Sequence, residues 1–173
     1  MGRLFGTDGV RGIANDKLSC ELAFKLGQAG AYVLTSSVHK ARILIGRDTR
    51  ISGDMLESAL VAGICSVGAE AVVAGVIPTS GVAFLTRDYG ADAGVVISAS
   101  HNSAEYNGIK FFNADGKKLP DEIEERIESI ILDGSETVQL KTGMQVGRRV
   151  GALNALAEYK EFLLGTTDTN LRG

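Results

Sequence analysis

Apolar side chains recur along this chain with two different spacings, and the two spacings alternate. Residues 19–36 carry Leu22, Leu26, Ala29 and Val33 on one stripe, which is the spacing of a helix face. The same spacing predicts further helices over residues 56–67, 78–89 and 120–131. Short apolar runs typical of strands lie between them, at residues 41–48, 69–77, 91–100 and 107–112.

This alternation predicts the fold class. In residues 91–100 both sets of alternate positions are mostly apolar, as expected for a strand that is covered on both faces. Helices that alternate with such strands indicate an α/β protein, a three-layer α/β/α sandwich around a mostly parallel, mixed sheet. We predict about four strands, with a weak fifth in residues 141–150.

The last part of the chain differs from the rest. Residues 154–165 have a helical pattern without an obvious core, and residues 166–173 are polar. We therefore expect one domain over residues 1–150, and a linker with the lead-in helix of a truncated second domain over residues 151–173. Leu156, Phe162 and Leu163 would then be exposed, so we predict disorder or self-association, for example as a homodimer.

Composition and charge narrow the range of partners. The 18 basic and 21 acidic side chains give a formal net charge of −3, so nothing favours a nucleic acid or an anionic membrane as partner. A small soluble ligand is expected instead. The start of the chain is glycine-rich and charged, and no apolar run approaches the ~18 residues of a membrane span, so we expect a cytoplasmic protein. Cys20 and Cys65 are not part of a Cys-x-x-Cys or Cys/His pattern of the kind that binds a metal ion, so we predict that both are reduced thiols in the core.

Three polar clusters follow or precede the predicted strands. They are FGTDGVRG at residues 5–12, GRDTR at 46–50 and SASHN at 98–102. Ligands of open α/β sheets bind beyond the carboxyl ends of the strands, so these clusters are expected to lie together. The donors that they offer suit a phosphate: Arg11, Arg47, Arg50, His101, Asn102 and Lys110.

Ser100 is the candidate nucleophile within this set. Ser98 continues the strand alternation and should be partly buried, whereas Ser100 lies in the following loop. A serine hydroxyl needs a neighbouring base or a strong electrophile. His101 is adjacent, but neighbours on an extended chain point apart, so His101 need not be the base and is an alternative donor to a phosphate.

Each cluster also has a plain structural interpretation. SASHN consists of common loop residues, and GRDTR would serve equally as a solvated strand end with an Asp–Arg pair. FGTDGVRG would serve as a simple turn, with Asp8-Gly9 supplying a positive φ. Lys110 would be the solvent-facing residue of an edge strand.

Taken together, the clusters resemble the first domain of the α-D-phosphohexomutases. FGTDGVRG, GRDTR, SASHN and NGIKFF occur in the family's order and spacing over about residues 1–150. Within the family, the start MGRLFGTDGVRGIAN is most similar to bacterial members that act on glucosamine phosphates. The resemblance implies that Ser100 is a phosphoserine, and that Thr7, Arg11, His101, Asn102 and Lys110 surround its phosphate or the substrate.

The activity implied is the interconversion of glucosamine 6-phosphate and glucosamine 1-phosphate, with glucomutase or mannomutase specificity as a close variant. Ser100 would exchange its phosphoryl group with the sugar, through a hexosamine 1,6-bisphosphate that also serves as activator. Such transfer depends on positioning and charge neutralisation more than on covalent assistance. Lys110 is the candidate for moving a proton at the sugar hydroxyl.

The resemblance also implies Mg²⁺, held by an oxygen of phosphorylated Ser100 and by a cluster of aspartates. No such aspartate cluster is present in this sequence, so the fragment is expected to be inactive alone. Two positions depart from the family pattern: Ser103 replaces a proline, and Tyr106 replaces an acidic residue. Without that proline, Ser100 should be more mobile.

Two other functional classes compete with this interpretation. A serine hydrolase would be expected to have a Gly-x-Ser-x-Gly elbow, and SASHN lacks glycine at those positions. A non-catalytic sugar-phosphate binding module with the same fold is the second alternative.

Overall fold

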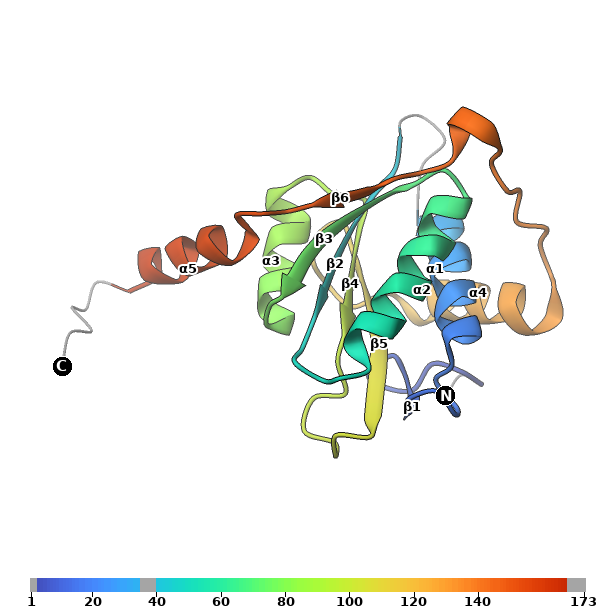
Figure 1. The fold of residues 1–173 in the computed structure, drawn as a ribbon, viewed down its shortest axis with the longest axis horizontal. Helices are drawn as coiled ribbons and strands as arrows, with labels where there is room; N and C mark the ends of the chain where they lie inside the picture. Colours follow the sequence, from blue (N-terminus) through green and yellow to red (C-terminus); the bar gives the residue numbers. More distant parts are fainter. Residues whose placement is uncertain (1–2, 35–39, 168–173) are drawn as a thin grey trace.

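The computed structural model describes residues 3–34 and 40–167, and Figure 1 shows their arrangement. Helices alternate with strands in the predicted order. The predicted helix over residues 19–36 is present from residue 20 to residue 34, and residues 35 and 36 lie outside the described residues. The predicted strand over residues 91–100 is present with shorter bounds. In chain order the elements are β1 (Val10–Ile13), α1 (Cys20–Leu34), β2 (Arg42–Arg47), α2 (Gly53–Ser66), β3 (Glu70–Val76), α3 (Thr79–Asp88), β4 (Ala93–Ile97), β5 (Tyr106–Asn113), α4 (Asp121–Asp133), a 3-10 turn (Gly143–Gln145), β6 (Arg149–Gly151) and α5 (Ala155–Gly165).

The strands form one mixed sheet in the order β1-β5-β4-β2-β3-β6. β2 pairs in parallel with β3 and β4, and β6 pairs in parallel with β3. β5 is antiparallel to β4, and β1 is antiparallel to β5. The prediction of about four strands is therefore wrong, because β1 and β6 extend the sheet at its two edges. Each has only four or three residues, too few to show a clear alternating pattern.

Helices cover both faces of the sheet, which confirms the three-layer prediction (Figure 1). α1, α2 and α4 pack on one face, where they share a core with Ile43 and Ile45 of β2. Leu44 points to the other face, into a second core beneath α3 and α5. Since successive side chains of a strand point to opposite faces, this explains why both sets of alternate positions are apolar.

The last described elements of the chain are attached to the sheet. β6 crosses the predicted domain boundary at residue 150, and α5 continues from it. Ala155 and Tyr159 are buried, and the ring of Phe162 stacks on Phe84 of α3 with centroids 3.9 Å apart. In place of disorder, the structure has a helix. The helix leaves Leu156, Phe162 and Leu163 exposed, as expected, and Leu164 as well. Self-association through them stays a prediction. The assignment of residues 151–173 to a second domain also stays a prediction, and residues 168–173 of the polar tail lie outside the described residues.

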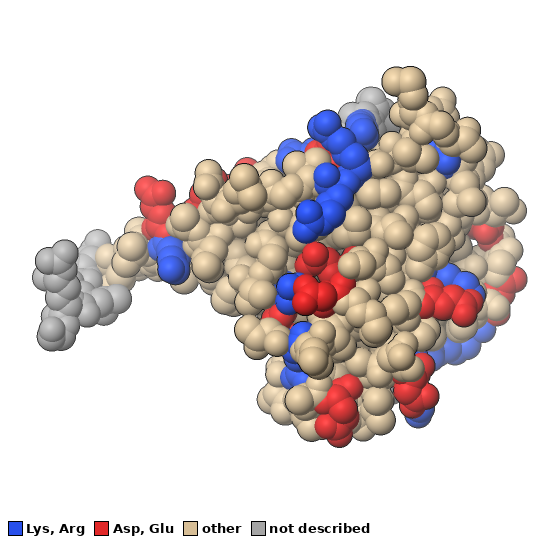
Figure 2. Space-filling model, in the orientation of Figure 1, with Lys and Arg blue, Asp and Glu red and all other residues tan. Residues whose placement is uncertain are grey.

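The surface carries charges of both signs close together. Figure 2 shows basic side chains gathered over β6, directly beside acidic ones. Two of these contacts are ion pairs: Arg148 to Glu70 at 2.8 Å and Arg149 to Glu57 at 3.8 Å. Among residues 3–34 and 40–167, no helix combines the length and the hydropathy that crossing a bilayer requires.

The two cysteines are free thiols, as predicted. Both are half-buried, so they are not the core residues that their apolar neighbours in the sequence indicated. Burial raises the pKa of the Cys65 thiol above its ordinary value.

Candidate functional site

Ser100 is presented by a tight loop that joins β4 to β5. We call residues 98–106 the serine loop, whose last residue is also the first residue of β5. The loop starts from a fixed point, because the N–H of Ser98 donates to the carbonyl of Gly108 at 2.9 Å. The Ser98 hydroxyl then accepts the N–H of Ser100 at 3.0 Å, and the N–H of Asn102 donates to the carbonyl of Ala99 at 3.1 Å. Ser98 is half-buried and Ser100 is exposed, as predicted.

The backbone at Ser100 explains how the serine meets its neighbour. Its φ is +57°, in the left-handed region that residues with a side chain rarely adopt. The chain is therefore not extended at this point, and the expectation that Ser100 and His101 point apart is wrong. The Ser100 hydroxyl and Nδ1 of His101 are 3.4 Å apart. This contact places a proton acceptor or donor next to the nucleophile.

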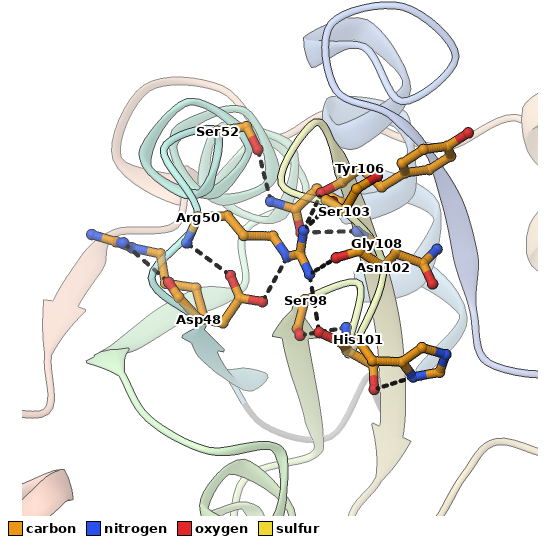
Figure 3. Close-up of polar contacts among 12 residues, drawn as sticks. Asp48, Arg50, Ser52, Ser98, His101, Asn102, Ser103, Tyr106 and Gly108 are labelled. Carbon is orange, nitrogen blue, oxygen red and sulfur yellow. Dashed lines mark hydrogen bonds and ion pairs between the residues drawn. The ribbon is translucent and has the colours of Figure 1, made fainter.

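Arg50 reaches into the serine loop from the segment that links β2 to α2 (Figure 3). One of its terminal nitrogens donates to the carbonyls of Ser103 at 2.6 Å and Tyr106 at 3.0 Å. The other donates to the carbonyls of Ser100 at 3.0 Å and Asn102 at 2.8 Å. Nε donates to the Asp48 carboxylate at 3.0 Å. The side chain is only 11% exposed.

Strand β5, which follows the serine loop, is tied by Asn107 to the segment that carries Arg50. Asn107 is fully buried. Its amide nitrogen donates to the Ser52 hydroxyl at 2.9 Å, and its amide oxygen accepts the N–H of Gly108 at 2.8 Å. Figure 3 shows these bonds beside those of Arg50. Both ends of the serine loop are therefore held by residues that precede α2.

The cluster FGTDGVRG forms a turn and then a strand. We call residues 5–9 the N-terminal turn, which closes where the N–H of Gly6 donates to the carbonyl of Gly9 at 3.0 Å. Gly9 has a φ of +83°, and a Cβ there would lie 2.4 Å from the carbonyl oxygen of Ile109. Only glycine fits this approach to β5. The simple-turn interpretation is therefore correct for residues 5–9, but Val10–Ile13 form strand β1.

The sheet register places Arg11 next to the serine loop. Arg11 of β1 lies opposite Gly108 of β5, and Gly108 in turn accepts the N–H of Ser98. A Cβ at Gly108 would lie 2.6 Å from the Ser98 carbonyl oxygen and 3.0 Å from Cγ of Arg11. The missing side chain at Gly108 thus lets the stem of Arg11 approach the start of the loop. The Nε of Arg11 is buried and has no acceptor among the described residues.

Lys110 belongs to the same cluster. It is two residues from Gly108 on β5, so its side chain lies on the same face of the sheet as that of Arg11. Its amino group is 3.2 Å from the carboxylate of Asp8 and 5.7 Å from the ring centroid of Phe112. β1 covers the edge of β5, so the interpretation of Lys110 as an edge-strand residue is wrong.

Asp8 joins the two cations, and the sequence analysis did not select it as a site residue. Its carboxylate accepts from Arg11 at 2.9 Å and from Lys110 at 3.2 Å. The hydrogen bond and the charge of Lys110 hold the pKa of Asp8 below its ordinary value, and the charge of Arg11 adds to this. Two cations around one carboxylate leave an excess of one positive charge beside the serine loop.

Arg47 and Arg50 have partners within the protein. Arg47 Nε is 3.2 Å from Glu57, and a terminal nitrogen also pairs with Asp54, both on α2. Arg50 is engaged by the loop carbonyls and by Asp48. Direct binding of a phosphate by either arginine would require these bonds to break. The Asp–Arg pair proposed as the plain interpretation of GRDTR is present, at 3.0 Å.

The remaining predicted residues lie around these two clusters. Thr7 is exposed at the tip of the N-terminal turn, beside a hollow of about 330 Å³ lined by residues 4, 6–9 and 11. Asn102 gives its carbonyl to Arg50, and Figure 3 shows its side chain pointing away from Arg50. His101 is exposed.

The N-terminal turn is held by a carboxylate on α4. Glu128 accepts the backbone N–H groups of Arg3 at 2.9 Å, Leu4 at 2.7 Å and Phe5 at 2.6 Å. Burial of Glu128 opposes its charge, but the N–H groups of Phe5, Leu4 and Arg3 outweigh burial and hold its pKa below the ordinary value. This anchor fixes the chain just before Thr7.

Magnesium ligands are not gathered in this region. Within residues 3–34 and 40–167, no group of three or more His, Cys, Asp or Glu side chains is arranged to hold a metal ion. Asp8, the carboxylate of the cation cluster, is already neutralised by Arg11 and Lys110. Hard oxygen ligands are what Mg²⁺ requires, so the described residues do not form a magnesium site by themselves.

Comparison with known proteins places this geometry in a family. The model of the family described as phosphoglucomutase/phosphomannomutase, alpha/beta/alpha domain I, matches residues 2–138. Among curated relatives, the phosphoglucosamine mutase of Clostridium novyi is 63% identical over 173 residues, and that of Acetivibrio thermocellus is 64% identical over 174. All of this chain is covered in both comparisons, but the chain spans only 38% and 39% of the length of these relatives.

Solved structures support the same fold. A phosphoglucomutase/phosphomannomutase family protein from Burkholderia thailandensis superimposes with a TM-score of 0.79 at 24% identity, over 98% of this chain and 36% of that chain. A phosphoglucomutase from Paramecium, parafusin, superimposes with a TM-score of 0.70 at 17% identity, over 96% of this chain and 35% of that chain. The fold, the match over residues 2–138 and the identity to the curated relatives together show that this chain belongs to the phosphoglucomutase/phosphomannomutase family, of which it contains the α/β/α domain I.

Proposed function

We propose that this chain is the phosphoserine-bearing domain of a phosphohexomutase that interconverts glucosamine 6-phosphate and glucosamine 1-phosphate. The observation that carries the proposal is the placement of Ser100. It is exposed at the tip of a tight loop, in contact with His101, and the loop starts beside the cation cluster of Arg11, Lys110 and Asp8.

The charge of the cluster suits a phosphorylated serine. A phosphoserine carries about −1.5 to −2 charges and three acceptor oxygens. Arg11 and Lys110 offer two positive charges against the single carboxylate of Asp8. A phosphoryl group on Ser100 would compete with Asp8 for both cations and would supply acceptors for unused donors of Arg11. Thr7 and Asn102 are further donors within the predicted set.

The reaction requires two transfers in opposite directions. In the first, the Oγ–P bond of phosphorylated Ser100 breaks, an O–P bond forms at the free hydroxyl of the sugar phosphate, and the hydroxyl proton is removed. We assign this proton transfer to Lys110, which accepts the hydroxyl proton as a neutral amine and so returns to its ammonium form. The Ser100 oxygen left by the first transfer takes a proton, and we assign the donor role to His101, whose Nδ1 is 3.4 Å from that oxygen. In the second, the sugar returns its other phosphoryl group to Ser100.

The preference for glucosamine phosphates rests on the names of the curated relatives, which are called phosphoglucosamine mutase. Specificity for glucose or mannose phosphates is the neighbouring alternative within the family. We further propose that a phosphoryl oxygen on Ser100 supplies one ligand to Mg²⁺ and that the other ligands come from outside the described residues. No step above depends on the ion.

The test is to locate the phosphoryl group. The full-length gene product is incubated with glucosamine 1,6-bisphosphate carrying labelled phosphate, and the labelled peptide is identified by mass spectrometry. We expect label on Ser100, complete loss of label in Ser100→Ala, and unchanged label in Ser103→Ala, which removes another hydroxyl of the same loop. Label on a different residue, or label that survives in Ser100→Ala, would refute the assignment.

A further inference from the structure

The carbonyl groups of the serine loop converge on one point. The oxygens of Ser100, Asn102, Ser103 and Tyr106 all lie within 3.0 Å of a terminal nitrogen of Arg50. Four carbonyl dipoles that point at one position repel each other unless a cation occupies it. The conformation of the serine loop therefore depends on a positive group at this position.

Arg50 matches this set of acceptors completely. A guanidinium group has five N–H donors in a rigid plane. Four are directed at the loop carbonyls and the fifth, on Nε, at Asp48. Asp48 also accepts the backbone N–H of Arg50 at 3.0 Å. The same carboxylate therefore holds both the backbone and the guanidinium group of Arg50. Figure 3 shows Arg50 between Asp48 and the loop.

Apart from Arg50, a small number of bonds hold the loop. The Ser98 hydroxyl accepts the N–H of Ser100 at 3.0 Å, and the N–H of Ala14 donates to the carbonyl of Glu105 at 2.9 Å. From Ala99 to Tyr106, the backbone bonds inside the loop are those of Asn102 to Ala99 and of Tyr106 to Ser103. Ser100 adopts its left-handed φ of +57° between them. That φ directs the Ser100 carbonyl toward Arg50 while the hydroxyl meets His101. Holding the carbonyl therefore orients the hydroxyl.

We propose that Arg50 is a positioning residue for phosphoryl transfer, which acts by holding the carbonyls of the serine loop so that the Ser100 hydroxyl is aimed correctly. The proposal rests on the proposed function of Ser100. Arg50 makes no contact with the phosphoryl group in this role. Lysine would keep the charge but has three donors and no planar fork, so it cannot satisfy the same four carbonyls.

The experiment compares Arg50→Lys with Arg42→Lys in the full-length gene product. Arg42 is the first residue of β2, whose other end leads into the segment that carries Arg50. It also donates to a backbone carbonyl, that of Tyr89 at 3.1 Å, so it is a matched control. Two quantities are measured: the rate of labelling of Ser100 by glucosamine 1,6-bisphosphate, and the hydrogen exchange of backbone amides in the serine loop, in α2 and in β2.

We expect Arg50→Lys to slow labelling of Ser100 by about 10²-fold, the loss typical of a reacting group misplaced by about 1 Å. The KM for the bisphosphate should stay within about 3-fold of wild type, because Arg50 does not bind it. Exchange should rise at least about 10-fold in the serine loop alone. In Arg50→Ala, added guanidinium should restore labelling, whereas ammonium should not.

Three results would overturn the proposal. They are loop exchange equal to wild type in Arg50→Lys, labelling within about 3-fold of Arg42→Lys, or exchange that rises equally in α2 and β2, which would make Arg50 a residue of general stability. If wild type itself takes no label on Ser100, the proposed function fails. The exchange data then still decide whether Arg50 holds the loop.

Discussion

Glu128 offers the sharpest test of how the N-terminal turn is held. This buried carboxylate accepts the N–H groups of Arg3, Leu4 and Phe5, at 2.9, 2.7 and 2.6 Å. We consider the change Glu128→Gln, which keeps the shape and removes the charge. One amide oxygen can still accept two of the N–H groups, but the amide nitrogen then faces the third donor.

The magnitude follows from the three bonds. A hydrogen bond to a charged group stabilises by about 1.5–3 kcal/mol, against about 0.5–1.5 kcal/mol for a neutral one. Losing about 1 kcal/mol at each of three bonds gives about 3 kcal/mol. For a domain of this size, 1 kcal/mol shifts the unfolding temperature by about 2–4 °C, so the expected decrease is about 6–12 °C.

The pH dependence has a definite sign. The pKa of Glu128 is lower in the folded protein than the ordinary value of about 4.3 that it has when unfolded. A carboxylate of this kind stabilises the fold fully above its unfolded pKa and loses that contribution as the pH falls through the folded pKa. The stability difference between wild type and Glu128→Gln should therefore be constant near pH 7 and shrink below about pH 4.3.

The assay is urea unfolding of this chain followed by circular dichroism, from pH 7 down to pH 3. The control is Glu125→Gln, the same substitution at an exposed position of α4, for which we expect a change within about 0.5 kcal/mol. The reasoning is refuted if Glu128→Gln is no less stable than Glu125→Gln at pH 7. It is also refuted if the difference grows on acidification.

Three further predictions concern the site and the last helix. Gly108→Ala should destabilise this chain by about 1–3 kcal/mol in urea unfolding, because the new Cβ would lie 2.6 Å from the Ser98 carbonyl oxygen. Asp8→Asn should strengthen binding of inorganic phosphate about 3- to 10-fold at low salt in a ³¹P NMR titration, because the carboxylate no longer neutralises Lys110. Phe162→Ala should lower stability by about 1 kcal/mol and speed amide exchange in α5 relative to α3, because it removes a stacked ring.

Each of these has a result that would contradict it. Gly165→Ala is the control for Gly108→Ala, because a Cβ at Gly165 would have nothing within 4 Å. If Gly108→Ala lowers the free energy of unfolding no more than Gly165→Ala does, the close approach at β5 is contradicted. Phosphate affinity that falls in Asp8→Asn would mean that Asp8 orients the cations instead of competing for them. Unchanged exchange in α5 would mean that the stacked ring contributes little to its docking on α3.

Much of the fold could be predicted because it depends on patterns within each segment. The helix stripes and the doubly apolar strands identified the α/β/α layers, and the motifs identified Ser100 as the exposed serine. β1 was missed because Val10–Ile13 is too short to show a period and becomes a strand only by pairing with β5. β6 was predicted only weakly for the same reason.

The contacts that organise the site are harder to predict for a different reason. Arg50 binds backbone carbonyls, which every residue has, so no side chain in the sequence indicates its partners. The meeting of Ser100 and His101 depends on a left-handed φ in a residue other than glycine. Asp8 was interpreted as a turn residue, and only the pairing of β1 with β5 shows that it lies between Arg11 and Lys110.

The anchoring of the N-terminal turn has a consequence for the order of folding during synthesis. Arg3 and Glu128 are separated by 125 positions in the chain, and β1 must likewise wait for β5, its only partner strand among the described residues. At about 5–20 residues per second, the ribosome needs roughly 6–25 s to make the partner of the first residues. The N-terminal segment is therefore the first part of this domain to be made and among the last to be fixed. A nascent chain halted before β5 would have Thr7 and Arg11 open to proteases and chaperones.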